Sequence, residues 1–164
     1  MKNNILINII FILFLIKSGF AENISIQSKN ITLDKNKETS IFQNEVFIKT
    51  QDGNVIKSDY AEYNKLSGLI KLRGSIIAKD NQQNSIKAKI AEFDENKDIF
   101  KSIGPTTITT TENYIIEGTD IIFDNRKSLI LSEKSVIITD QEKNKIYLDS
   151  FEYLTKSNIF KSIG

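Results

Sequence analysis

The sequence contains no cysteine and no histidine among its 164 residues. Without cysteine the chain has neither a disulfide framework nor a thiolate metal site. Without histidine it lacks the side chain that most often serves as a general base, or as a metal ligand, near neutral pH. These absences argue against a hydrolase or a metalloenzyme, and we expect a protein that is not an enzyme and has no metal and no cofactor.

Long apolar runs are absent except near the N-terminus. Residues 5–16 are almost wholly apolar, with Lys2 before them and small residues leading up to Ala21 after them. A charged start, an apolar run of about 7–15 residues and a small-residue exit are typical of a secretory signal peptide. A membrane span needs about 20 apolar residues. We predict a signal peptide over residues 1–21 and an exported protein, with a membrane anchor as the alternative.

The chain also lacks an excess of charge of either sign. It has 22 basic and 21 acidic side chains, and removal of Lys2 and Lys17 leaves 20 basic ones, for a net charge of about −1. Binding to phosphate backbones needs clustered lysine and arginine, so we expect no nucleic-acid partner. The remaining residues, 22–164, fit one domain.

From residue 22 onward the sequence repeats every thirty residues without a gap. The hexapeptide at 99–104 recurs unchanged at 159–164. One column of the repeat is isoleucine in all five rows: Ile26, Ile56, Ile86, Ile116 and Ile146. A second is aromatic and is headed by Leu33: Tyr63, Phe93, Phe123 and Tyr153. A fixed period of this length is typical of stacked repeat architectures.

Each repeat predicts two strands and two turns. In one repeat, residues 55–63 and 69–78 are rich in strand formers, and turn residues occupy 64–68 and 80–84. Short turns join antiparallel neighbours, whereas parallel neighbours need a long crossover. Helical spacing is not sustained after residue 21. We therefore predict an all-β fold of stacked antiparallel strands.

The alternation of apolar residues slips once in each repeat. Ile56 and Tyr63 are seven residues apart, yet both columns are apolar throughout. Because successive side chains of a strand point to opposite faces, a bulge or corner near Asp59 and Tyr60 must reset the pattern. Its repetition bends every first strand at the same height, which predicts a trough or a closed roll.

The last repeat ends at Gly164, where earlier repeats continue into a further half-strand. An uncovered strand edge is a template for pairing. We expect a domain truncated at its C-terminal edge, with docking of that edge onto a partner as the alternative.

The segment at 61–76, AEYNKLSGLIKLRGSI, resembles the repeat of the OstA-like family. That family repeats an alanine, an aromatic residue followed by Asp or Asn, a turn, an apolar strand and Gly-Asn-Val. The rows at 91–104 and 123–136 follow less closely, with Pro105 at the family's asparagine and no glycine in the second. The resemblance covers residues 24–164.

The resemblance implies a twisted β-jelly roll, open along one side, that takes part in lipopolysaccharide transport to the outer membrane. It implies a periplasmic domain that shields lipid A acyl chains in an apolar groove and docks edge to edge with similar domains of LptA, LptC or LptD. The incomplete last repeat favours the N-terminal part of an LptD-like outer-membrane assembly protein. A stand-alone LptA-like bridge remains open, as does a structural or adhesive β-solenoid without a ligand.

The apolar columns are the candidate lining of the groove, and the alternative is that they simply fill a core. The candidates are Ile56, Ile86, Ile116, Ile146, Tyr63, Phe93, Phe123, Tyr153, Ile48, Ala78, Ile108 and Ile138. Glutamate recurs at Glu62, Glu92 and Glu152, which we assign to a solvated outer face. Lysine recurs at Lys71, Lys101 and Lys161, either for solubility or to meet lipid phosphates.

Overall fold

The computed structural model describes residues 24–162, so the predicted signal peptide lies outside the described residues. The regular structure of residues 24–162 is all strand, which confirms the predicted all-β class. Within that range no helix is long and apolar enough to cross a bilayer. The strands are β1 (Ile24–Gln27), β2 (Asn30–Asp34), β3 (Thr39–Thr50), β4 (Val55–Asn64), β5 (Leu69–Lys79), β6 (Ser85–Asp94), β7 (Ile99–Ile103), β8 (Pro105–Thr109), β9 (Ile115–Thr119), β10 (Ile122–Asp124), β11 (Leu129–Ser132), β12 (Val136–Thr139), β13 (Lys145–Leu148), β14 (Phe151–Leu154) and β15 (Ile159–Ser162).

The strands form one sheet in which neighbours pair antiparallel, as predicted. The turns explain why this pairing recurs. Asn64 closes β4, and its Oδ1 accepts a hydrogen bond from the backbone N–H of Ser67 at 3.0 Å. In the same way, Oδ1 of Asp94 accepts from the backbone N–H of Lys97, and Oδ1 of Asp124 accepts from that of Lys127. Such Asx turns favour a chain reversal, and the repeat supplies one every thirty residues.

The bend predicted near Asp59 is present. The pairing of β4 with β5 shifts register between Lys57 and Tyr60, and the pairing of β5 with β6 shifts between Arg73 and Ile76. Gly74 lies in this second shift with φ +99°, and a Cβ there would meet the Asp59 carboxylate at 2.3 Å. Glycine suits this corner because it tolerates positive φ and close approach.

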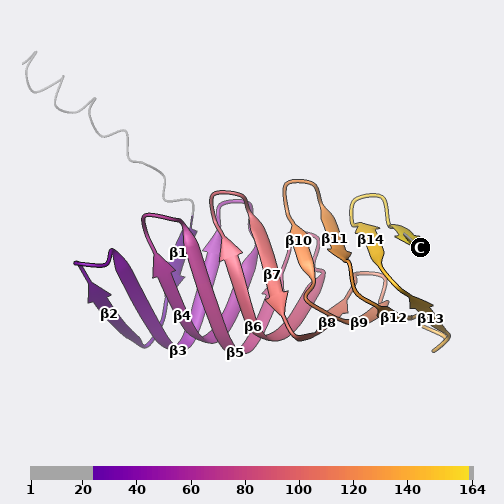
Figure 1. Ribbon diagram of the computed structural model, residues 1–164, viewed down its shortest axis with the longest axis horizontal. Coiled ribbons are helices and arrows are strands. Elements are labelled where there is room, and N and C mark those ends of the chain that lie inside the picture. Colours follow the sequence, from indigo (N-terminus) through magenta and orange to yellow (C-terminus); the bar gives the residue numbers. More distant parts are fainter. Residues whose placement is uncertain (1–23, 163–164) are drawn as a thin grey trace, which may run out of the picture.

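The bends divide the sheet into two facing half-sheets. Half-sheet A comprises β2, β7, β10, β11, β14 and β15, together with the halves of β3 to β6 that pair with them. Half-sheet B comprises β1, β8, β9, β12 and β13 with the other halves of β3 to β6. The chain bends along the lower border of Figure 1, and most hairpin turns lie along its upper border.

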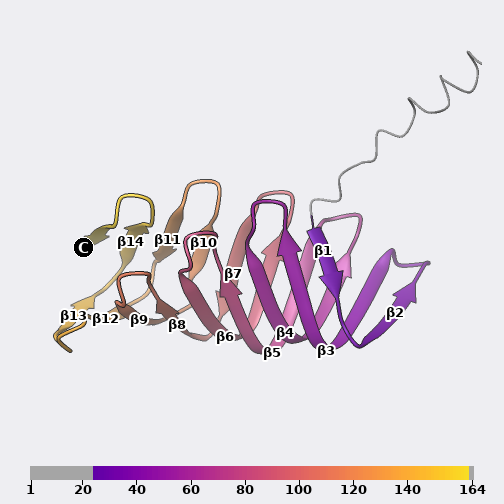
Figure 2. The ribbon, with the colours of Figure 1, turned by 180° about the vertical axis from the view of Figure 1, so that it is seen from behind.

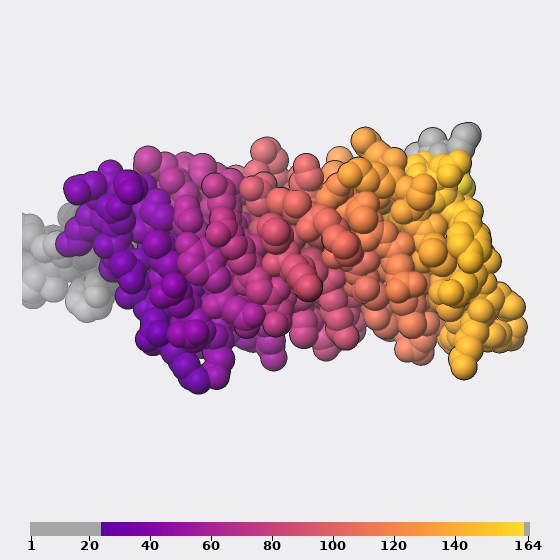
Figure 3. All heavy atoms as spheres, turned by 60° about the horizontal axis from the view of Figure 1, so that its bottom comes forward, coloured from indigo at the N-terminus to yellow at the C-terminus, as the bar shows by residue number. Residues whose placement is uncertain are grey.

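The turns form two rows that border the open side of the trough. Turn row A, on half-sheet A, joins its strands at 34–39, 64–69, 94–99, 124–129 and 154–159. Turn row B, on half-sheet B, lies at 50–54, 80–84, 110–114 and 140–144. Figure 2 shows turn row B descending toward the C-terminal end, as expected from sheet twist. We call the space between the rows the seam. Seen toward the bend, the surface runs unbroken along the stack (Figure 3).

Both half-sheets direct apolar side chains into a shared interior. Strand β6 shows how one strand serves both: Ala91 and Phe93 point inward from half-sheet A, and Ile86 and Ala88 from half-sheet B. Ile86 and Phe93 are seven residues apart, so without the irregularity at the bend one of the two pairs would point outward. No buried side-chain nitrogen or oxygen in the described part of the chain lacks a hydrogen-bond partner.

Candidate functional site

A continuous line of aliphatic residues runs along the interior of half-sheet B. Each member is the direct cross-strand partner of the next, across nine adjacent strands or half-strands. We call it line B: Ile26, Ile48, Ile56, Ala78, Ile86, Ile108, Ile116, Ile138 and Ile146. Direct partners on one face have Cβ atoms about 5 Å apart. The structure therefore merges two separate columns of the sequence into one line, which contains eight of the twelve predicted groove residues.

A second line runs along half-sheet A and is rich in aromatic residues. It contains the other four predicted residues, each paired with a residue from a column that the sequence analysis did not select. We call it line A: Leu33, Ser40, Tyr63, Ile70, Phe93, Phe100, Phe123, Ile130, Tyr153 and Phe160. The missed members Ile70, Phe100, Ile130 and Phe160 are also spaced by thirty residues. The thirty-residue spacing of this apolar column could therefore have identified these residues from the sequence.

Most of the two lines forms a packed core. Ile48, Ile108 and Ile116 are 0% exposed, and Phe93 is 2% exposed. Most members of both lines belong to one cluster of buried residues, with Tyr63 and Phe160 half-buried against it. An acyl chain can enter such an interior only if the half-sheets move apart, because packed cores leave few voids larger than a water molecule.

The lines reach solvent at the ends of the stack. Ile146, the last member of line B, is 53% exposed, unlike the other predicted groove residues. At the opposite end Leu33 is 65% exposed, and Ile31, paired with the buried Phe42, is 54% exposed. These side chains are inward-facing residues with no further strand stacked on them within the described chain.

Hydrogen bonds tie each turn row along its own length. In turn row B, Oδ1 of Asn54 accepts from the N–H of Asn81, and Oδ1 of Asn84 accepts from the N–H of Thr111, both at 3.1 Å. In turn row A, backbone bonds link successive turns, as from the N–H of Glu95 to the carbonyl of Gly68 at 3.0 Å. Each half-sheet is thus braced along the stack, and the two half-sheets are joined at the bends.

One cluster joins the two rows across the seam, near the C-terminal end. Tyr153 donates from its hydroxyl to Oε2 of Glu112 at 3.1 Å, and the amide of Asn158 donates to Oε1 of the same carboxylate. Phe160 stacks on Tyr153 with ring centroids 4.2 Å apart and meets Tyr114 edge-on at 5.4 Å. Burial, and next the Glu112 carboxylate, raise the pKa of Tyr153, so its hydroxyl stays a donor. We call these five residues the latch.

The charged columns lie on the outside of half-sheet A. Lys71 pairs with both Glu62 and Glu92, which pairs in turn with Lys101. A second pair joins Glu152 to Lys161. The expected outer position of the glutamates agrees with this register. The lysines share that face and alternate with glutamates, so they form no cationic cluster at the seam.

No group of three potential metal-binding side chains occurs within residues 24–162. No pair of carboxylates faces the apolar interior among the buried residues of the two lines. The two lines thus present mainly apolar side chains to the interior.

No family profile matches the sequence, and no curated protein matches it. A search of solved structures finds the crystal structure of LptH from Pseudomonas aeruginosa, described as the LptA-homologous periplasmic component of the conserved lipopolysaccharide transport device. The match has a TM-score of 0.59 and 11% sequence identity. It covers 76% of this chain and 93% of the LptH chain.

At this identity the match defines the fold: the chain is an open, bent antiparallel β-jelly roll of the LptA type. The predicted fold class is confirmed. The OstA-like resemblance agrees with that fold and stays a prediction at the level of the sequence family.

Proposed function

We propose that this chain is a periplasmic component of lipopolysaccharide transport and that its interior shields the acyl chains. The observation that carries the proposal is the pair of apolar lines A and B, broken by a polar side chain only at Ser40 of line A, which face each other inside a fold of the LptA type. A carrier that passes a lipid onward needs many similar apolar contacts in series, and stacked identical columns provide them.

The length of line B suits a passage better than a single binding site. With neighbouring strands about 4.8 Å apart, its nine members extend over about 38 Å. An acyl chain that spans half the hydrocarbon core of a bilayer is roughly 15 Å long. This length is shorter than half of line B. Each buried methylene of an acyl chain gains about 0.8 kcal/mol, so a chain can occupy successive stretches of the line at nearly constant free energy.

The ends of the stack support partners of the same fold. Strands β1 and β2 at one end, and β13 and β15 at the other, each have one edge without a partner strand in the described chain. Exposed edges pair readily with other strands. We propose edge-to-edge docking with similar β-jelly-roll domains of the transport device, in the periplasm.

A second candidate is a structural β-solenoid without a ligand. The observation that favours it is the packed interior, in which most members of the two lines are almost fully buried. The two candidates differ in one respect that can be measured. A carrier must open along the seam to admit lipid, whereas a structural solenoid has no reason to do so.

Photo-crosslinking separates these candidates. A photoreactive residue at Ile86 or Phe93 should capture lipopolysaccharide, because both side chains lie in the interior and are 2% exposed. The matched controls are Lys87 and Glu92, their direct neighbours in β6, whose side chains point to the outer face. Capture from the interior positions with little from the controls is the expected result, read from the mass shift of the protein. Labelling from the control positions alone would contradict the proposal.

Within this class, the N-terminal part of an LptD-like protein remains the prediction from the sequence, and a stand-alone LptA-like bridge the alternative. The genomic sequence that follows codon 164 tests the choice. A continuation that encodes a membrane barrel supports LptD, and a stop codon supports the bridge.

A further inference from the structure

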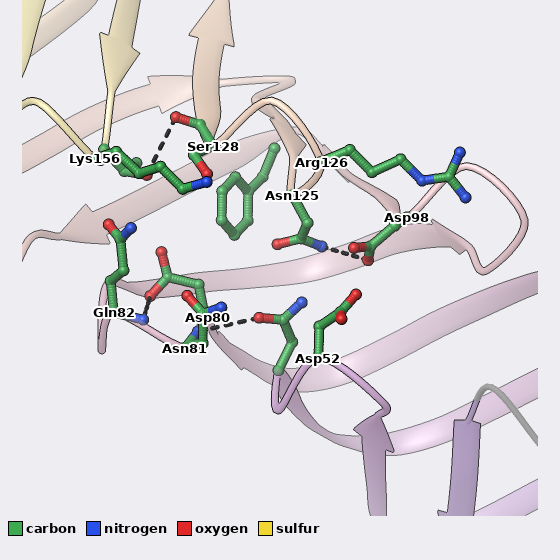
Figure 4. Close-up of a pocket in the computed structure, with 12 residues that line it drawn as sticks. Asp52, Asp80, Asn81, Gln82, Asp98, Asn125, Arg126, Ser128 and Lys156 are labelled. Atoms are coloured by element: carbon green, nitrogen blue, oxygen red, sulfur yellow. Dashed lines mark hydrogen bonds between the residues drawn. The ribbon is translucent and has the colours of Figure 1, made fainter.

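A polar pocket of about 270 Å³ lies in the seam (Figure 4). Its lining includes Phe123, which is also a member of line A, so the pocket adjoins the apolar interior. The pocket draws its polar residues from both turn rows. Those with charged or amide side chains that carry the argument are Asp52, Asp80 and Gln82 from turn row B, and Asp98, Arg126 and Lys156 from turn row A.

Two buried carboxylates give the pocket its shape. Oδ1 of Asp80 accepts hydrogen bonds from the backbone N–H groups of Gln82 at 2.9 Å and Asn84 at 2.8 Å. Oδ1 of Asp98 accepts from the side-chain amide of Asn125 at 2.7 Å. Burial is the main cause that raises the pKa of both carboxyl groups. These contacts tie the walls to the turn backbones, so the pocket exists before any ligand binds.

Other polar groups of the pocket remain available. In the described part of the chain, no hydrogen bond or ion pair engages the side chains of Asp52, Gln82 or Lys156. Figure 4 shows Gln82 and Lys156 on opposite walls. Arg126 uses its NH2 nitrogen to donate to the carbonyl of Asn96 at 2.6 Å and has further N–H groups to offer. The pocket therefore offers both hydrogen-bond donors and acceptors.

The charges of the pocket select the class of ligand. A free anion would face three carboxylates against two cationic side chains, and a metal cation would face Arg126 and Lys156. A neutral polyhydroxyl ring suits both the carboxylates and the cationic side chains, because each hydroxyl donates one hydrogen bond and accepts others. The volume is slightly below the range of pockets for drug-sized ligands, about 300–1,000 Å³, which fits one ring rather than a long chain.

We infer that the seam pocket holds a sugar ring from the polar head of an amphiphile, whose acyl chain lies beneath it against Phe123 and its neighbours in line A. The inference rests on the proposed function and deepens it. The sugar stays in the polar seam and the acyl chain in the apolar interior, so a single bound molecule spans the boundary between them.

Two amphiphiles with the same tail provide the test. Dodecyl maltoside has a sugar head and dodecylphosphocholine does not, and binding of each is measured below its micelle concentration by amide chemical shifts. The pocket variant is Asp52→Asn with Lys156→Gln, which removes two unpaired charged groups without changing the net charge. The matched control is Glu142→Gln with Lys145→Gln, on exposed side chains of turn 140–144 and its following strand.

The pocket variant should bind the maltoside about tenfold more weakly, which corresponds to about 1.4 kcal/mol, and the phosphocholine unchanged. The control should bind both as the unmodified protein does, and the side-chain amides of Asn81, Gln82 and Asn125 should shift with the maltoside alone. Equal affinity for both amphiphiles, unaffected by the pocket variant, overturns the sugar site and leaves the proposed function standing. Binding of neither amphiphile overturns the proposed function, and the sugar site with it.

Discussion

The proposed function predicts that a short covalent bridge across the seam abolishes lipopolysaccharide binding in a protein that still folds. The bridge joins cysteines introduced by Glu112→Cys and Asn158→Cys, whose side chains already meet in the latch. Since the natural chain has no cysteine, a bismaleimide reacts only at these two positions. With the half-sheets held together, the packed lines A and B cannot separate, and affinity should fall at least tenfold, about 1.4 kcal/mol or more.

Two controls isolate the effect of the bridge. The same double variant without the reagent should bind lipopolysaccharide nearly as well as the natural protein does. This control separates the effect of the cross-link from the effect of the two substitutions. A bridge along turn row B, from Glu112→Cys to Gln141→Cys, should leave binding intact because it lies parallel to the line of bends. The Gln141 amide donates to the Glu112 carbonyl at 2.7 Å, so these positions are also adjacent. Unchanged binding in the bridged seam would place the lipid outside the interior and favour the structural solenoid.

The sequence predicts those features of the fold that depend on local chemistry repeated every thirty residues. The turn after β4 is set by Asn64, and its equivalents at Asp94 and Asp124 use the same Asx geometry. The slip in apolar parity between Ile56 and Tyr63 locates the bend, because a strand has no other means of resetting its faces. Neither feature requires knowledge of distant contacts.

The register across the bend was harder to predict. Above the bend Asn64 pairs with Leu69, and an unshifted ladder would pair Ile56 with Ile77. The shift pairs Ile56 with Ala78 instead, which is why two columns of the sequence become the single line B. A bulge changes the register by one residue, and the parity of one strand does not reveal how its partner strand bends.

The latch could not be predicted for a different reason. Tyr114 occupies a position that is asparagine in the other turns of its row, at Asn54, Asn84 and Asn144. In the sequence, Tyr114 is only a single substitution in a column of asparagines. Its role depends on the sheet twist, which sets the distance between the turn rows at the point where Phe160 packs against the Tyr114 ring. Such distances depend on the whole stack.

A charge placed in line B should have an effect that depends on its position along the stack. Ile108 is 0% exposed and Ile146 is 53% exposed, although both belong to the same line. Ile108→Asp removes a buried aliphatic side chain and buries a carboxyl group without a partner, which should lower the free energy of unfolding by more than about 4 kcal/mol. Ile146→Asp should change it by less than about 1 kcal/mol, because the new carboxylate stays in water. Urea denaturation measures both.

The pH dependence of the two variants supplies an internal check. Burial raises the pKa of a carboxyl group, so the folded Ile108→Asp variant binds its proton at higher pH than the unfolded chain does. Its destabilisation is therefore largest above the folded-state pKa and shrinks as the pH falls through that value. Ile146→Asp should show no such recovery. Equal destabilisation by both substitutions would mean that Ile146 is covered in solution, so that line B does not open to solvent at that end. If only Ile108→Asp unfolds the protein, Ile146→Asp places a charge at the exposed end of line B in an intact fold, and the proposed function predicts that this variant transfers lipid more slowly.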